Sequence, residues 1–142
     1  MPKNNEMSIA FKSCSENESF ARVAVSAFFS QIDPTVDELY DVKMAVSEAV
    51  TNCIIHGYEG DVTQTIIIKC SYEEQTIEIE VIDRGKGIGD VKEAMQPLYT
   101  SCEEDERAGL GFTVMESMMD KVEVSSIIGE GTSVKLTKTF IG

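Results

Sequence analysis

The stretch Asp37–Gly57, DELYDVKMAVSEAVTNCIIHG, decides how the rest of the chain is interpreted. Its apolar residues recur every three or four positions, the period of a helix with one buried stripe: Leu39, Val42, Val46, Ala49, Val50 and Cys53. Thr35 and Glu38 have the spacing of a capping box at its start, and Gly57 suits the left-handed position after its end. We therefore predict that this stretch is the central helix of the core.

A second row of side chains on the same helix is polar. Glu48, Asn52 and His56 follow one another at intervals of four residues, so they share one side of the helix beside the apolar stripe. Taken alone, this row is more simply explained as a solvated helix face. Two later glycine clusters, at 83–89 (DRGKGIG) and 109–111 (GLG), favour a functional interpretation instead.

Composition limits the class of protein. With 142 residues, 42% of them hydrophobic, the chain is expected to form a single domain over 1–142. No apolar run could span a bilayer, and the first residues lack the hydrophobic segment of a signal peptide, so we expect a cytoplasmic protein without membrane contact. The four cysteines form no C-x-x-C pair and only one histidine is present, which predicts free thiols rather than a zinc site.

The formal net charge of −13 indicates which partners to expect. Such an acidic chain repels nucleic-acid phosphates unless it carries a concentrated basic patch, and the sequence has none. We therefore expect no direct contact with nucleic acid and protein partners with basic surfaces. A nucleotide would be repelled as well, so a site for one would need backbone amides and a metal ion.

Periodicity along the chain predicts an α+β fold. Residues 58–64 form a loop, and the pattern loosens over 90–107, a candidate mobile flap. The predicted strands span 7–12, 65–72, 76–83, 122–127 and 132–140, and the other predicted helices span 16–32 and 110–119. The expected architecture is a two-layer sandwich, a mainly antiparallel sheet covered on one face by helices.

The first of these helices is predicted to begin with a second capping box, Ser15 with Glu18. Its core stripe is predicted to be Phe20, Val23, Ala24, Ala27 and Phe28. Val25 and Phe29 fall on a different side, near Arg22. These three residues either widen the buried face or form an exposed surface for docking a protein partner, since an arginine beside apolar residues is typical of interfaces.

The glycine clusters suit a phosphate-bearing ligand. Asp83, at a strand end before Gly85 and Gly87, could accept a hydrogen bond from an exocyclic amine such as that of adenine. Gly109 and Gly111 are predicted to open a helix, whose unpaired amides would face phosphate. The first cluster is neither a Walker P-loop nor a dinucleotide fingerprint, because it lacks the Gly-Lys-Ser/Thr ending and opens no βαβ unit.

Four segments together carry a resemblance to a known family. EAVTNCIIHGYE at 48–59, DRGKGI at 83–88, RAGLGF at 107–112 and GT at 131–132 resemble the N, G1, G2 and last boxes of the GHKL ATP-binding superfamily. The flanking residues are similar to those of the anti-sigma factor family of spore-forming bacteria, small serine kinases that also sequester a sigma factor. The resemblance covers nearly the whole chain, and it implies an ATP-binding fold of the Bergerat type.

The resemblance also implies roles for individual residues. Glu48 would be the general base on the attacking hydroxyl, and Asn52 the Mg²⁺ ligand. Asp83, assisted by Thr132, would bind the adenine of ATP or ADP. Gly85 and Gly87 would shape the floor of the pocket, and Gly109 and Gly111 would form the wall around the phosphates. Arg107 would contact the γ-phosphate or hold the flap. The implied partners are a sigma factor, an anti-anti-sigma protein that is phosphorylated on serine, and a second copy of the chain in a homodimer.

Two departures and three alternatives accompany this resemblance. The flap of the family usually carries a lysine after a threonine pair, whereas 100–103 reads TSCE, and Gly89 stands where proline is common. One alternative is a nucleotide-dependent sigma-binding module with little kinase activity. Another is the catalytic domain of a sensor histidine kinase, against which Glu48 and the missing phosphoacceptor domain weigh. A repair or topoisomerase ATPase would need further domains.

Overall fold

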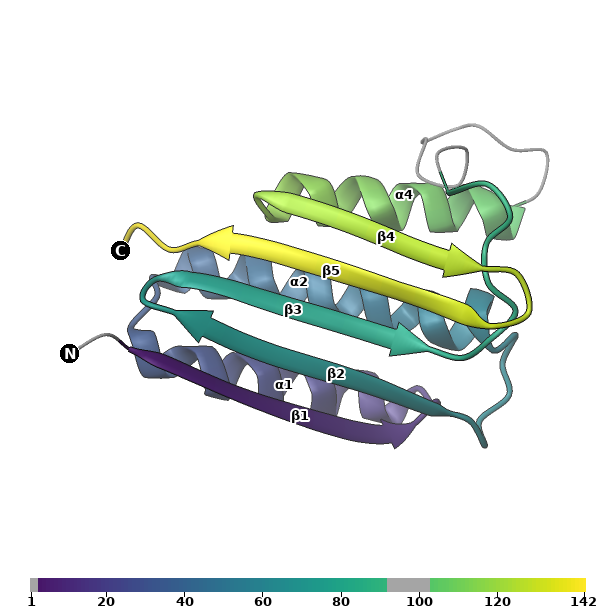
Figure 1. The fold of residues 1–142 in the computed structure, drawn as a ribbon, viewed down its shortest axis with the longest axis horizontal. Coiled ribbons are helices and arrows are strands. Elements are labelled where there is room, and N and C mark those ends of the chain that lie inside the picture. The colour runs from purple at the N-terminus through teal and green to yellow at the C-terminus, as the bar shows by residue number, and fades with distance from the viewer. Residues whose placement is uncertain (1–2, 92–102) are drawn as a thin grey trace.

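The computed structural model describes the backbone of residues 3–91 and 103–142, and the side chains of residues 3–91 and 111–142. Within these ranges, five strands form one antiparallel sheet in the order β1-β2-β3-β5-β4 (Figure 1). The strands are β1 Asn4–Lys12, β2 Thr65–Glu73, β3 Thr76–Asp83, β4 Lys121–Ile127 and β5 Gly131–Thr139. The helical elements are α1 Glu16–Phe29, η1 Ser30–Ile32, α2 Val36–Asn52, the π-helical turn η2 Cys53–Gly57, and α4 Glu103–Met118.

The three α-helices among the described residues lie on one face of the sheet (Figure 1). Alternation along the strands produces this arrangement, because every second side chain of β2 and β3 is buried beneath the helices. The buried residues of these two strands are Asp83 and the apolar Ile66, Ile68, Cys70, Tyr72, Ile77, Ile79 and Val81. The predicted α+β sandwich is confirmed, and the strand limits agree within one residue except that β1 begins three residues earlier.

The central helix forms as predicted at its start. The Thr35 hydroxyl accepts a hydrogen bond from the Glu38 amide at 3.1 Å, and the Glu38 carboxylate accepts one from the Thr35 amide at 2.9 Å. This capping box satisfies two amides that the first turn would otherwise leave unpaired. The predicted stripe of α2 is buried from Val42 to Cys53.

The first helix buries Phe28 as predicted, but the rest of its packed face differs from the predicted stripe. Val25 and Phe29 are 0% exposed, whereas Phe20 and Val23 are 55% and 62% exposed. The prediction that Val25 and Phe29 form an exposed docking surface is therefore wrong. The predicted capping box is wrong too, because Ser15 makes no side-chain cap and Glu18 instead accepts a hydrogen bond from Ser47 of α2.

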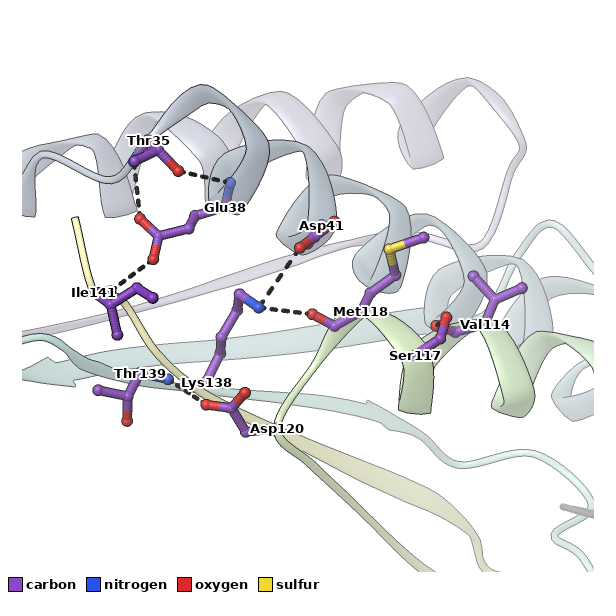
Figure 2. A network of polar contacts seen from close by, with 10 residues as sticks. All are labelled: Thr35, Glu38, Asp41, Val114, Ser117, Met118, Asp120, Lys138, Thr139 and Ile141. Carbon is purple, nitrogen blue, oxygen red and sulfur yellow. Dashed lines mark hydrogen bonds and ion pairs between the residues drawn. The ribbon is translucent and has the colours of Figure 1, made fainter.

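A polar network ties the far ends of α2, α4 and β5 together (Figure 2). Lys138 of β5 donates to the Met118 carbonyl at 3.0 Å and lies 3.6 Å from the Asp41 carboxylate. Because this carbonyl belongs to the last residue of α4, the lysine satisfies an acceptor that the helix end leaves unpaired. The Ile141 amide donates to Glu38, which joins the end of the chain to the capping box.

The last helix begins earlier than predicted. It starts at Glu103, so the end of the predicted flap, 103–107, is helical rather than loose, and 92–102 lies outside the described residues. Glutamate is a good helix former, which gives the acidic run a local reason to be helical. No helix in the described parts of the chain is long and apolar enough to cross a membrane.

Candidate nucleotide site

Two of the three residues in the polar row of α2 meet at one place. Glu48 and Asn52 both lie against Gly111 of α4, where an added methyl group would be 3.1 Å from Glu48 Oε2 and 3.3 Å from both amide atoms of Asn52. Glycine at 111 therefore allows α4 to approach this pair closely. His56 follows in the π-helical turn, where the i→i+5 hydrogen-bond pattern ends the four-residue spacing, and it is half-buried.

The environment of Glu48 makes its carboxylate a stronger base. Burial raises the pKa of Glu48, and the negative charge of Glu18 raises it further. Glu18 is held on α1 between the Ser47 hydroxyl, which donates to it, and the Arg22 guanidinium, whose Nε lies 4.0 Å away. A base whose pKa lies closer to working pH accepts a proton more effectively, provided that it stays ionised.

Asn52 offers an amide that the described part of the protein does not satisfy. Its Nδ2 is buried and has no hydrogen-bond partner there. Native proteins rarely leave such groups unpaired, so this amide is available for a ligand. Because Nδ2 is a donor, its unmet need suits a phosphate oxygen and not a cation. Mg²⁺ would be held by the Oδ1 of the same amide, since this ion is usually held by one or two protein oxygens together with substrate phosphates and waters. The fit rests on Asn52 alone, as the described residues contain no group of three His, Cys, Asp or Glu able to hold a metal.

Asp83 is a buried carboxylate at the end of β3, 5% exposed. Burial raises its pKa, and the hydrogen bonds that it accepts from Gly85, Cys53 and Thr132 oppose this rise. The bond from the Gly85 amide is 2.9 Å long. Gly57 lies against the same carboxylate, and a methyl group there would be 2.8 Å from its Cγ. The predicted left-handed Gly57 is wrong, because its φ is not positive and its role is this close approach.

The first glycine cluster is fixed between η2 and the turn that joins β4 to β5. The Lys86 amide donates to the Gly57 carbonyl at 3.0 Å, and the Gly129 amide donates to the Lys86 carbonyl at 2.7 Å. A methyl group on Gly85 would lie 2.0 Å from the Gly57 oxygen, and one on Gly87 would lie 2.3 Å from the Ile127 oxygen. Only glycine permits these two backbone approaches.

Tyr58 supports this loop, although the sequence placed it in a plain connection. Its hydroxyl donates to the Thr65 carbonyl at 2.5 Å and accepts from the Arg84 amide at 2.7 Å, so it joins the start of β2 to the loop after β3. The ring is 8% exposed. A large aromatic residue directly after a glycine was the available signal for this role.

The second glycine cluster does not open a helix as predicted. Arg107, Gly109 and Gly111 all lie inside α4, which begins at Glu103. Interior helical amides are bonded to carbonyls four residues earlier, so in this structure they are not free to bind phosphate. The backbone brings Gly111 to Glu48 and Asn52, while the side chain of Arg107 lies outside the described residues.

Comparison with known proteins identifies the class of protein that this fold and site define. The family model for the histidine kinase-like ATPase domain matches residues 12–138. Among solved structures, the crystal structure of the RsbU and RsbW domains of Rv1364c from Mycobacterium tuberculosis aligns with a TM-score of 0.70 at 19% identity. That alignment covers 96% of this chain and 32% of the other, about a third of its length, and it supports the fold alone.

Curated relatives give the family within this class. The anti-sigma F factor of Thermoanaerobacter sp. (strain X514) is 56% identical over 142 residues, which is 100% of this chain and 98% of the relative. The anti-sigma F factor of Oceanobacillus iheyensis is 56% identical over 134 residues, with 94% and 92% covered. That of Clostridium beijerinckii is 56% identical over 137 residues, with 96% of each covered. The chain belongs to the anti-sigma F factor family.

Proposed function

We propose that this chain binds and inhibits a sporulation sigma factor, and that it uses Mg-ATP to phosphorylate a serine of an anti-anti-sigma protein. The observation that carries the proposal is the meeting of a half-buried carboxylate with a raised pKa, Glu48, and an amide whose Nδ2 is unsatisfied, Asn52, at Gly111. Phosphoryl transfer depends mostly on positioning and on neutralising charge. The pair would position the attacking hydroxyl and a Mg²⁺ ion, and that ion would neutralise the charge.

Each residue of the pair has a separate task. Glu48 accepts the proton of the serine hydroxyl as the oxygen attacks the γ-phosphorus. The bond from that phosphorus to the oxygen bridging the β- and γ-phosphates breaks, and ADP leaves. Asn52 would hold Mg²⁺ through its Oδ1, and the ion when bound would neutralise the phosphate charge that an acidic chain otherwise repels. Asp83 and Thr132 bind the base at the end of β3, above the floor formed by Gly85 and Gly87.

The phosphate wall requires a rearrangement of α4. For the amides of Gly109 and Gly111 to bind phosphate, the turns of α4 before them must unwind, because these amides are intrahelical in the structure. Arg107 lies in the same segment and would move with it.

The alternative is a nucleotide-dependent sigma-binding module with little transfer. Glu48 distinguishes the two proposals, since a module that only binds needs no base beside Asn52. The test is to incubate the protein with γ-labelled ATP and a purified anti-anti-sigma partner, and then to locate the label.

Glu48→Gln keeps the shape of the side chain and removes its basicity. We expect it to lower phosphoryl transfer about 10²- to 10⁴-fold while ADP affinity stays within about twofold. Glu16→Gln, at the start of α1, is the matched control and keeps the wild-type rate. Transfer by Glu48→Gln at the wild-type rate, with the control also active, would favour the binding module.

The partner surface is proposed to include Arg22, which is 38% exposed on α1. The exposed apolar side chains near it are Phe20 and Val23 rather than the residues predicted from the sequence. The homodimer implied by the family resemblance stays a prediction, and light scattering of the purified chain with and without ADP measures it.

A further inference from the structure

Three polar side chains lie side by side across the sheet at the end where β3 finishes. Asp83 pairs with Thr132 of β5, and Thr132 pairs with Ser126 of β4. Directly paired residues of antiparallel strands project from the same face, here the face that the helices cover. The next two rows are apolar: Val81, Val134 and Val124, and then Ile79, Leu136 and Val122. The polar row therefore marks where the core ends and the site begins.

Ser126 has three hydrogen-bond partners in this row and the loop beside it. Its Oγ lies 2.6 Å from the Ile88 amide nitrogen, 3.0 Å from the Gly131 carbonyl oxygen and 2.9 Å from the Thr132 hydroxyl oxygen. A serine hydroxyl has one proton to donate and two lone pairs that accept. The Ile88 amide can only donate and the Gly131 carbonyl can only accept. All three contacts are therefore satisfied only if Ser126 donates to Gly131 and accepts from both Ile88 and Thr132.

This arrangement fixes the direction of the Thr132 proton. Because Thr132 donates its only hydroxyl proton to Ser126, its oxygen has nothing but lone pairs to offer a ligand. The neighbouring Asp83 carboxylate, when ionised, also only accepts. This end of the site therefore presents acceptors from two adjacent strands and no side-chain donor from the row.

We propose that Ser126 is a positioning residue that holds Thr132 as an acceptor and thereby makes the site select a purine with a 6-amino group over one with a 6-oxo group. The inference rests on the proposed nucleotide site and adds a residue to which no role in it was assigned. Adenine offers amino protons to both acceptors. Hypoxanthine would instead place its 6-oxo oxygen against these acceptors. With no proton between the facing lone pairs no hydrogen bond can form, so hypoxanthine binds less tightly.

The experiment measures ADP and IDP affinities by calorimetry at one pH and salt concentration. The proteins are wild type, Ser126→Ala, Thr132→Val and the double variant. Ser125→Ala is the matched control, because Ser125 is the exposed neighbour on β4 and projects from the opposite face. Thermal melts without nucleotide accompany every protein, so that a loss of stability is seen separately from a change in selectivity.

We expect wild type and Ser125→Ala to prefer ADP by the same ratio. In Ser126→Ala the Thr132 hydroxyl is free to turn and donate to a 6-oxo group, so the ADP-to-IDP ratio should fall about tenfold. In the Thr132→Val background, adding Ser126→Ala should leave the ratio unchanged, because the hydroxyl that Ser126 orients is gone.

Two results would overturn the proposal. If Ser126→Ala lowers the melting temperature but keeps the wild-type ratio, Ser126 is only structural. If the two substitutions change the ratio independently, Ser126 does not act through Thr132. Failure of the wild-type protein to bind either nucleotide is a different outcome, since it removes the proposed function as well.

Discussion

Gly57 shows how closely single residues are fitted around the site. Its Cα lies against the Asp83 carboxylate, and its carbonyl receives the Lys86 amide of the first glycine loop. The sequence placed it in a left-handed helix cap, because glycine after a helical pattern usually has that role. A pattern within one segment could not show that a distant strand end would lie against it.

Gly57→Ala should therefore harm binding more than stability alone explains. The added methyl group would lie 2.8 Å from Asp83 and must displace it, so we expect ADP affinity to fall about tenfold and stability to fall by about 1–3 kcal/mol. Gly60→Ala is the control: its surroundings are open but its φ is +83°, so it should lose about 1 kcal/mol and bind ADP normally. Equal ADP affinity in both variants would contradict this account.

Ionisation of the buried Asp83 carboxyl group lowers the stability of the fold, and this effect depends on pH. Its pKa is raised above the ordinary value of 3.8, so the folded state holds the proton more tightly than the unfolded chain does. Stability contributed by this group is therefore present at low pH and is lost as pH rises from the ordinary pKa through the folded one. In the proposed site, ionisation of Asp83 at neutral pH would serve the ligand rather than the fold.

Asp83→Asn removes this dependence and keeps an oxygen for the Gly85 amide. Relative to wild type, the variant should gain stability as pH rises from about 3 to 7, and its ADP affinity should fall. Urea unfolding at several pH values measures the difference. A variant that loses stability relative to wild type over this range would show that the carboxylate stabilises the fold.

At the scale of elements, Lys138 joins β5 to the end of α4 and to α2 (Figure 2). Its side chain is 13% exposed, so the bonds that it makes are protected from water. Lys138→Met keeps most of the apolar stem but leaves the Met118 carbonyl and Asp41 unpaired. We expect a loss of about 1.5–3 kcal/mol in urea unfolding.

Lys135→Met on the same strand is the matched control for this prediction. Lys135 lies 3.5 Å from Glu78, but both side chains are more than 40% exposed, and exposed ion pairs contribute little. We expect the control to lose less than about 0.5 kcal/mol. Similar losses of stability in the two variants would mean that the contacts of Lys138 with α2 and α4 stabilise the fold no more than an exposed ion pair does.

The elements also show how far the sequence can predict this fold. The limits of β3 and the buried stripe of α2 were predictable from the sequence. Strict alternation in a strand and a single apolar stripe on a helix each leave only one face that can be buried. In α1 the apolar residues Phe20, Val23, Val25 and Phe29 offer two stripes, and only the position of the helix over the sheet decides which is buried. The π-helical turn of η2 has no sequence pattern of its own.

For the candidate site, the sequence predicts residue types more than geometry. Glu48, Asn52 and Asp83 stand out only in combination, because the polar row on the helix is followed by two glycine clusters and the whole pattern resembles a known family. Ser126 and Tyr58 do not stand out, since their roles come from hydrogen bonds to residues far away in sequence. Such partners become known only when the strands are paired.

At the scale of the whole molecule, an acidic chain must present a defined surface to each protein partner. Arg22 lies on the outside of α1, held only by Glu18 at 4.0 Å among the contacts of the described residues. A partner carboxylate could compete for this guanidinium, because an exposed ion pair of that length contributes little.

Arg22→Glu should weaken the sigma-factor complex by about 2 kcal/mol or more while ADP affinity and melting temperature stay near the wild-type values. Lys69→Glu makes the same change of charge on the uncovered face of the sheet and should leave the complex intact. Quantitative pull-down or interferometry measures both. Equal weakening by the two variants would indicate a general charge effect instead of a docking surface on α1.

The placement of the chain ends has a practical consequence. Figure 1 shows the beginning of β1 and the C-terminus at one end of the sheet, whereas the arrowhead of β3 and the β4–β5 turn lie at the opposite end. Any additional polypeptide joined at either end, whether an affinity tag, a fluorescent reporter or another domain, would leave from the side remote from Asp83. The protein can therefore be immobilised through either end with the candidate nucleotide site turned toward the solution.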